Sequence, residues 1–426
     1  MVNPSWRTQV LLLLLALGLR LALAVALYSR PSLFDPSYVT DNWDNIARNL
    51  LHGRGFSWVE DGSVPTMTRG PGYTVYLAAL MLVTRDDLLL MRIIYLALDS
   101  AMAVAVLRMG CRVFNDRATG TVAGLFYAIY LLPAWHIMKL APDALFSFVL
   151  FMALAAFVAM VESKQRGFRS TWLAVLAGIL FGFAILTKQT AVLLLPVWVG
   201  VLLLQRQNYR AVVPSVLVWV VAAGIIVTPW LYRNYRLAGT IAPTETLTWF
   251  NYWYGDFADR NMSNMSAEEF SNAAADYIRN LGGSGIYLPY SLPPRVDLER
   301  EKLFRNLAFH QIKSEPGHVV AKSMRNVPRF WYMIETGRMT RPSRVIGGLV
   351  GALFVSGSIL SLLRWRRSPG AMLMLSTVVC FNLAYAPVFS IMRYMIPVVP
   401  YVAMFVGIVL VDLARRARKP QRLVLA

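Results

Sequence analysis

The chain has 426 residues, of which 57% are apolar and only 15% are charged, and its mean hydropathy is +0.50. A soluble protein carries about 25% charged residues, so this composition excludes a soluble globular protein and predicts a polytopic membrane protein. The formal net charge of +19 would favour a nucleic-acid partner in a soluble protein. In a membrane protein the location of the basic residues decides their meaning, and we expect no nucleic-acid partner.

Ten segments are apolar enough to cross a bilayer, each of which takes roughly 20 residues. They cover residues 9–28, 88–110, 118–138, 143–161, 171–187, 190–204, 212–231, 345–363, 371–389 and 395–413. The first segment has no small-residue cleavage site after it, so we expect a retained signal anchor. Cys111 and Cys380 lie in or at the end of such segments and predict neither a disulfide framework nor a metal site.

The basic connections between these segments predict the orientation of the chain. With the N-terminus in the cytoplasm, every even-numbered connection is short and basic, from "RMGCRVFNDR" to "RWRRSP", and so is the tail "ARRARKPQR". The positive-inside rule therefore predicts a multi-pass protein of the cell (inner or plasma) membrane, with both termini in the cytoplasm.

The stretch over 70–84, "GPGYTVYLAALMLVT", is too short to cross comfortably, and we expect an amphipathic or re-entrant helix at the outer interface. Three regions result. Residues 1–231 form a transmembrane module of seven spans, whose first outer loop, 29–87, carries juxtamembrane helices. Residues 232–343 form a small, mainly helical extracytoplasmic domain, and residues 344–426 form a second transmembrane module of three spans with a basic tail.

The positive-inside rule does not explain the basic residues near the outer ends of the spans. Such a cluster suggests a bound anionic group, with phosphate as the commonest candidate, although anchoring of helix ends is the alternative for each residue. The candidates are Arg69, Lys139, Lys188, Arg233, Arg236 and Arg393. Arg20 and Asp99 lie at similar depth in adjacent spans, where we expect a structural ion pair.

The first outer loop contains "TDNWDNIARNLLHGRGFSW", residues 40–58, whose apolar residues recur at helical spacing. Thr40 or Asp41 is a suitable helix cap, and Asp44 pairs with Arg48 four residues later. Asp41 has a second interpretation, because it would lie opposite the outer cations. A carboxylate that arginines keep ionised beside a phosphoester can act as a general base.

Six stretches in this order resemble the bacterial ArnT-like and protein O-mannosyltransferase-like glycosyltransferases of the GT-C superfamily. They are "DNWDNIARNLLHGRGFSW", "PTMTRGPGYTVYLAALML", "LAPDALFSFVLFMALAA", "GFAILTKQTAVLLLPVWV", "TPWLYRNYRLAGTIAPT" and "RYMIPVVPYVAMFVGIVLV". The resemblance extends from Asp41 to the last span. It implies an all-α GT-C-type fold and a transferase that takes a sugar from a polyprenyl-phosphate donor at the outer face.

The resemblance also implies roles for individual residues. Asp41 matches the acidic residue of the first outer loop, with Asp44 as the alternative register. The residues implied to bind the donor phosphate are Arg69, Lys188, Arg233, Arg393 and Tyr394. Further donor or acceptor contacts are expected from Arg48, Tyr73, Lys139, Asp143 and Arg236. No cofactor is predicted, and a divalent metal is not indicated by any ligand pattern.

The residues fit this chemistry, because a lipid phosphate leaves readily once guanidinium groups neutralise its charge. A single displacement should invert the anomeric configuration, with a lipid, a glycan or a protein as the acceptor. Two alternatives stay open. One is a lipid-linked oligosaccharide polymerase or ligase, and the other is a non-enzymatic transporter or flippase of lipid-linked substrates, against which the absence of two repeated halves argues.

Overall fold

The computed structural model describes residues 3–30, 34–37, 39, 41, 43–163, 168–205, 209–261, 267–280, 292–334 and 341–417. These residues form helices joined by short connections, and their one β feature is an isolated bridge between Ser57 and Pro65. The predicted all-α membrane fold is confirmed.

Eight helical segments of the described chain are long and apolar enough to cross a membrane. They are α1 (Trp6–Tyr28), α4 (Leu88–Phe114), α5 (Arg117–Ile129) with α6 (Leu132–Met138), α7 (Asp143–Val161), α8 (Phe168–Thr187), α10 (Tyr209–Ala238), α15 (Arg341–Trp365), and η3 (Met392–Val398) with α17 (Val399–Ala417). Two of the ten predicted spans are shorter, namely η2 (Gln189–Leu193) with α9 (Leu194–Leu204), and α16 (Pro369–Tyr385). The count of ten is therefore not confirmed.

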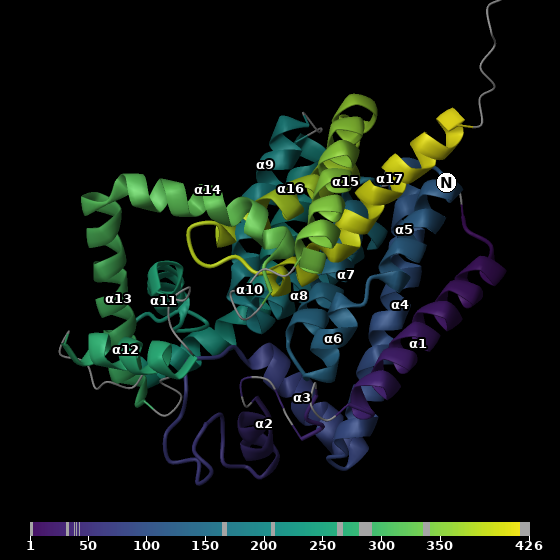
Figure 1. The fold of residues 1–426 in the computed structure, drawn as a ribbon. Coiled ribbons are helices and arrows are strands. Elements are labelled where there is room, and N and C mark those ends of the chain that lie inside the picture. The colour runs from purple at the N-terminus through teal and green to yellow at the C-terminus, as the bar shows by residue number, and fades with distance from the viewer. Residues whose placement is uncertain are drawn as a thin grey trace, which may run out of the picture.

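The basic connections meet at one end of the bundle. Arg112 at the end of α4 pairs with Glu162 after α7 at 3.0 Å, and Arg415 at the end of α17 pairs with Asp116 before α5 at 2.9 Å. Gln9 near the start of α1 accepts a hydrogen bond from Arg108 of α4 at 2.6 Å. The start of α1 and the end of α17 therefore lie on the same side of the bundle as these connections, away from α2 (Trp43–Leu51) and α3 (Pro71–Thr84) (Figure 1).

The helix expected over 70–84 is present as α3. Tyr73 and Leu77 are completely buried, whereas the exposed side carries Val75, Leu82 and Val83. The helix is thus apolar all round, and the amphipathic alternative was wrong. A helix with this composition is stable only inside protein or lipid.

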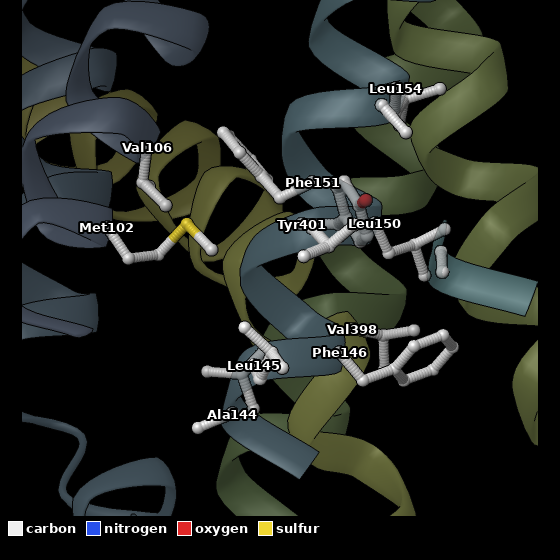
Figure 2. Packing of buried hydrophobic residues seen from close by; sticks show 14 of the residues in the cluster. Met102, Val106, Ala144, Leu145, Phe146, Leu150, Phe151, Leu154, Val398 and Tyr401 are labelled. Atoms are coloured by element: carbon white, nitrogen blue, oxygen red, sulfur yellow. The ribbon is translucent and has the colours of Figure 1, made fainter. Parts of the chain in front are cut away.

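The centre of the bundle is built around α7, which has buried side chains on every side. Figure 2 shows side chains on both sides of α7, with Leu145 and Phe151 on the side of Met102 and Val106 of α4, and Phe146 and Leu150 on the side away from α4. Phe151 of α7 stacks on Tyr401 with ring centroids 5.5 Å apart. This packing fixes the first residue of α7 relative to η3.

Helices α11 (Thr248–Asn261), α12 (Ala267–Asn280), α13 (Pro294–Ser314) and α14 (Pro316–Tyr332) lie in the segment assigned to the extracytoplasmic domain. They gather beside one face of the bundle (Figure 1). Phe250 and Trp253 of α11 pack on Phe304 of α13 with centroids 5.4 and 5.0 Å apart. Glu301 of α13 accepts the backbone N–H groups of Trp249 and Phe250, which satisfies the start of α11.

The predicted ion pair between Arg20 and Asp99 is confirmed and is deeply buried. Arg20 Nε lies 2.6 Å from Asp99 Oδ2, and the Tyr127 hydroxyl donates to Asp99 Oδ1 at 2.6 Å. Arg20 also donates to the carbonyl oxygen of Ala128 at 3.0 Å. The pair joins α1, α4 and α5 with most of its polar atoms satisfied.

Removal of this carboxylate should destabilise the bundle strongly. Asp99→Ala leaves a buried guanidinium without its counter-ion, which costs about 3–5 kcal/mol. Thermal unfolding of the purified protein in detergent measures the loss. Asp276→Ala, which removes an exposed ion pair with Arg279, is the control and should change stability little. Equal unfolding temperatures for the two variants would contradict the role of Asp99.

Candidate active site

A cavity of about 610 Å³ opens where the first outer loop, the end of α8, η3 and the start of α11 come together. Its wall contains four cationic side chains, Arg69, Lys139, Lys188 and Arg393. Aromatic side chains form much of the remainder, namely Trp43, Phe250, Tyr254, Tyr385, Phe389 and Tyr394. The cavity thus combines excess positive charge with broad apolar surfaces.

Asp41 faces two of these cations across the cavity. Its Oδ2 atom lies 3.8 Å from Arg69 Nη2 and 3.5 Å from Arg393 Nη2. The backbone of Asp41 has φ = 57°, in the left-handed region that few residues other than glycine adopt. Such a conformation costs about 1–3 kcal/mol and persists only where the surroundings impose it, often at functional sites. Asp41 precedes α2 and is held out toward the cations.

Asp143 is completely buried and bridges two other cations. Its Oδ2 atom accepts from Arg393 Nε at 2.8 Å, and its Oδ1 atom accepts from Lys188 Nζ. Because Asp143 is the first residue of α7, the helix dipole also favours its negative charge. The buried carboxylate therefore fixes the two cations at the cavity wall and offsets part of their charge.

Lys188 and Arg393 each lie where a helix is interrupted, and these interruptions bring the two cations close together. Lys188 has extended backbone between the end of α8 and η2, and Arg393 lies in the 3₁₀ turn η3. Tyr394 stacks on Tyr385 of α16 with centroids 4.2 Å apart, and Lys188 Nζ lies 6.0 Å from the Tyr394 ring. A cation over an aromatic face gains about 0.5–2 kcal/mol.

Two glycines allow Arg69 to lie beside Lys188. A Cβ atom on Gly70 would come 2.3 Å from the carbonyl oxygen of Leu186, and one on Gly72 would come 2.5 Å from Thr187 Oγ1. The "GPG" sequence therefore lets the start of α3 touch the end of α8. Arg69 then stacks over Trp43 at 5.0 Å.

Six of the predicted site residues do not line the cavity, and one of them is the completely buried Asp143. Asp44 and Arg48 pair on α2 at 3.9 Å, and Arg48 also pairs with Asp86. The Tyr73 hydroxyl donates to the carbonyl oxygen of Leu140 behind the wall, and Arg236 is exposed beside Tyr232.

Arg233 is the sixth. It donates to the loop carbonyl oxygens of Thr66 and Phe56 at 2.9 and 3.3 Å and stacks on Trp230 at 4.3 Å. The structure thus directs Arg233 to the first outer loop and not to the cavity, because its guanidinium is surrounded by that loop. These contacts hold the loop against α10.

Sequence reasoning missed Glu245, the second carboxylate of the cavity wall. Glu245 lies in the connection between α10 and α11, and its Oε1 atom accepts the backbone N–H of Gly70 at 3.3 Å. Burial raises the pKa of Glu245 to about 7, although Arg69 and the Gly70 N–H oppose this shift. The available signal was an isolated acidic residue in the otherwise uncharged stretch "GTIAPTETLTWF".

The described residues contain no group of three or more histidine, cysteine, aspartate or glutamate side chains placed to hold a metal ion.

Residues 68–232 match the family model described as dolichyl-phosphate-mannose-protein mannosyltransferase. This region runs from just before Arg69 into α10 and includes Lys139, Asp143 and Lys188. A comparison with curated protein sequences gives no significant match.

Solved structures share the fold at low sequence identity. The oligosaccharyltransferase AglB from Archaeoglobus fulgidus, in complex with an inhibitory peptide and a dolichol-phosphate, is 15% identical with a TM-score of 0.58, over 99% of this chain and 53% of that chain. The apo form of the Archaeoglobus fulgidus oligosaccharyltransferase is 15% identical with a TM-score of 0.61, over 96% of this chain and 51% of that chain. This chain therefore spans about half the length of those chains.

The structure of ArnT from Cupriavidus metallidurans bound to undecaprenyl phosphate also matches, at 14% identity and a TM-score of 0.42, over 96% of this chain and 79% of that chain. The chain thus shares the fold of the Archaeoglobus fulgidus oligosaccharyltransferase structures. The family match to residues 68–232 and the shared fold confirm the predicted resemblance to GT-C glycosyltransferases.

The close contact at Gly72 gives a test of how the wall is assembled. Gly72→Ala places a methyl group against backbone of Thr187, so α3 must move away from α8, at a cost of about 1–3 kcal/mol. Thermal unfolding in detergent should show this loss. Gly200→Ala in α9 is the control, because nothing lies within 4 Å of the added atom. An unfolding temperature for Gly72→Ala equal to that of the control would show that the contact is not needed.

Proposed function

We propose that this protein is an integral membrane glycosyltransferase that transfers a sugar from a polyprenyl-phosphate donor to a lipid, glycan or protein acceptor at the extracytoplasmic face. The observation that carries the proposal is the cavity in which the Asp41 carboxylate lies 3.5 and 3.8 Å from Arg393 and Arg69. The donor is of the undecaprenyl- or dolichyl-phosphate type, and the transferred group is a hexose or a pentose.

Charge explains why phosphate fits the cavity. Four cationic side chains line the wall, and among the described residues Asp41 and Asp143 form ion pairs with three of them. The remaining positive charge suits a phosphodiester before transfer and a phosphomonoester after it. Arg69 and Arg393 can each donate two N–H groups to phosphate oxygens, which is the geometry that arginine offers to oxyanions.

The reaction follows from this arrangement. Asp41 takes the proton of the acceptor hydroxyl or amine as that atom attacks the sugar carbon, and the carbon–oxygen bond to the phosphate breaks. Fixed cations at the departing phosphate stabilise the charge that develops there. The attack comes from the side opposite the phosphate, so the anomeric configuration inverts. The family match and the AglB complex with a dolichol-phosphate support a donor of this class.

The proposed location of the site on the extracytoplasmic face rests on the position of the cavity in the bundle. The basic connections gather at one end of the bundle, and the cavity lies at the start of α7 and the end of α8, which is the other end. Under the positive-inside rule the cavity faces the extracytoplasmic side, and both termini lie in the cytoplasm.

Asp41→Asn should abolish transfer, since an amide cannot accept the proton, and the expected loss is about 10²–10⁴-fold in kcat. Consumption of undecaprenyl-phosphate sugars with a radiolabelled sugar, by purified protein in detergent, measures the effect. Asp44→Asn is the matched control, because Asp44 lies on α2 outside the cavity wall. An active Asp41→Asn variant would remove Asp41 from the mechanism. Transfer in detergent, without a sealed compartment, also excludes transport as the activity.

The cations should determine affinity for the lipid phosphate. Arg69→Ala removes charge-assisted hydrogen bonds worth about 1.5–3 kcal/mol, so the Kd for undecaprenyl phosphate should rise roughly 10- to 100-fold. Microscale thermophoresis or tryptophan fluorescence in detergent provides the measurement. Arg236→Ala removes an equal charge from an exposed position outside the cavity and should leave Kd unchanged. Equal losses in both variants would point to general electrostatic attraction and not to a phosphate site.

A further inference from the structure

Glu245 is held in the cavity wall by one of its two carboxyl oxygens. Its Oε1 atom accepts the Gly70 N–H at 3.3 Å, and the described residues donate no hydrogen bond to Oε2. The glycine approaches this closely for a steric reason as well, because a Cβ atom on Gly70 would lie 3.1 Å from Oε1. The Gly70 N–H therefore holds Oε1 of Glu245 in place, on the side of the cavity formed by the α10–α11 connection.

The two carboxylates of the wall have opposite surroundings. Asp41 is one-third exposed and lies within ion-pair distance of Arg69 and Arg393. Glu245 lines the cavity and takes part in no ion pair within 4 Å among the described residues. Two carboxyl groups whose surroundings differ in this way are suited to opposite tasks, one as base and one as acid.

We propose that Glu245 is the acid partner of Asp41 and gives its proton to the phosphate oxygen that leaves the sugar. This inference rests on the proposed function, because the phosphate in question is that of the polyprenyl donor. A neutral carboxylic acid is also what the phosphate requires at this position, since an ionised Glu245 would repel it.

The step balances in protons and electrons. The acceptor oxygen or nitrogen forms its bond to the sugar carbon and loses its proton to Asp41. The bond between the sugar carbon and the phosphate oxygen breaks, and its electron pair stays on that oxygen, which receives the proton of Glu245. The products are the glycosylated acceptor and a singly charged polyprenyl phosphate, with Asp41 protonated and Glu245 ionised. A proton from water to Glu245 and one from Asp41 to water restore the starting state.

The charged and titratable groups around Glu245 come from three other elements. They are Arg69 before α3, Lys188 between α8 and η2, and Tyr385 of α16. The two cations favour ionisation of Glu245, but burial outweighs them, and its pKa is about 7. The acid form is therefore present below pH 7 and is lost as the pH rises through this value. Activity that needs the acid form must fall over the same range.

The experiment compares the Glu245→Gln variant with the wild-type protein, both full-length and in detergent. It measures the Kd for undecaprenyl phosphate between pH 5.5 and 8.5. Glutamine keeps an oxygen for the Gly70 N–H but cannot ionise. If binding needs the acid form, the ratio of the wild-type Kd to the variant Kd should be near one at pH 5.5 and rise up to about 30-fold at pH 8.5. The second ionisation of the phosphate, near pH 6, acts equally on both proteins and cancels in the ratio.

Turnover gives the second readout. Glu245→Gln should lower kcat about 10²-fold at pH 6 with little change in the KM for the donor, and the fall of kcat between pH 6 and 8 should disappear. A purely structural role would leave the shape of this profile unchanged. Asp44→Asn, outside the cavity wall, is the control and should keep the wild-type profile.

The outcomes separate the two proposals. If the wild-type protein binds undecaprenyl phosphate and Asp41→Asn is inactive, but the Kd ratio stays at one over the whole pH range, Glu245 is not the acid and the proposed function stands. If the wild-type protein does not bind undecaprenyl phosphate at any pH, both proposals fail.

Discussion

A buried carboxylate between two cations organises the functional end of this protein. Asp143 has no exposed surface, and it holds Lys188 from the end of α8 and Arg393 from η3. An unpaired charge in such a position would cost several kcal/mol, so the three segments have to meet. Their meeting places two basic side chains at the cavity wall with less than their full charge neutralised. The same interaction therefore stabilises the fold and places two cations where the proposed function needs a phosphate site.

The remaining wall comes from segments that pack around this ion triad. Gly70 and Gly72 bring the start of α3 against the end of α8, and Arg69 follows directly from that contact. The left-handed backbone of Asp41 turns its carboxylate toward Arg69 and Arg393. A carboxylate is thus held on one side of the cations. The proposed transfer from a phosphate donor would need this separation between the acceptor and the leaving group.

The connection between α10 and α11 closes the cavity from the side of the outer helices, which are α11 to α14. Glu245 reaches Gly70 from this connection, and Phe250 and Tyr254 of α11 add aromatic surface. The helices behind them are fixed by buried polar contacts, such as Glu301 on the N–H groups at the start of α11. The cavity is consequently shared by the transmembrane bundle and the outer helices. Neither part would form the complete wall without the other.

The sequence by itself determined the membrane fold, the shared end of the basic connections and the convergence of Asp41, Arg69, Lys188 and Arg393. These follow from sequence because lipid makes every charge costly, so a charge near a span end has to have a reason. The depth of a residue along a helix, however, does not tell which way its side chain points. Only the tertiary structure decided that Arg233 faces a loop, that Arg48 and Arg236 stay outside the cavity, and that Glu245 meets Gly70. That last contact joins residues 175 positions apart, a pairing that no local pattern contains and that packing alone creates.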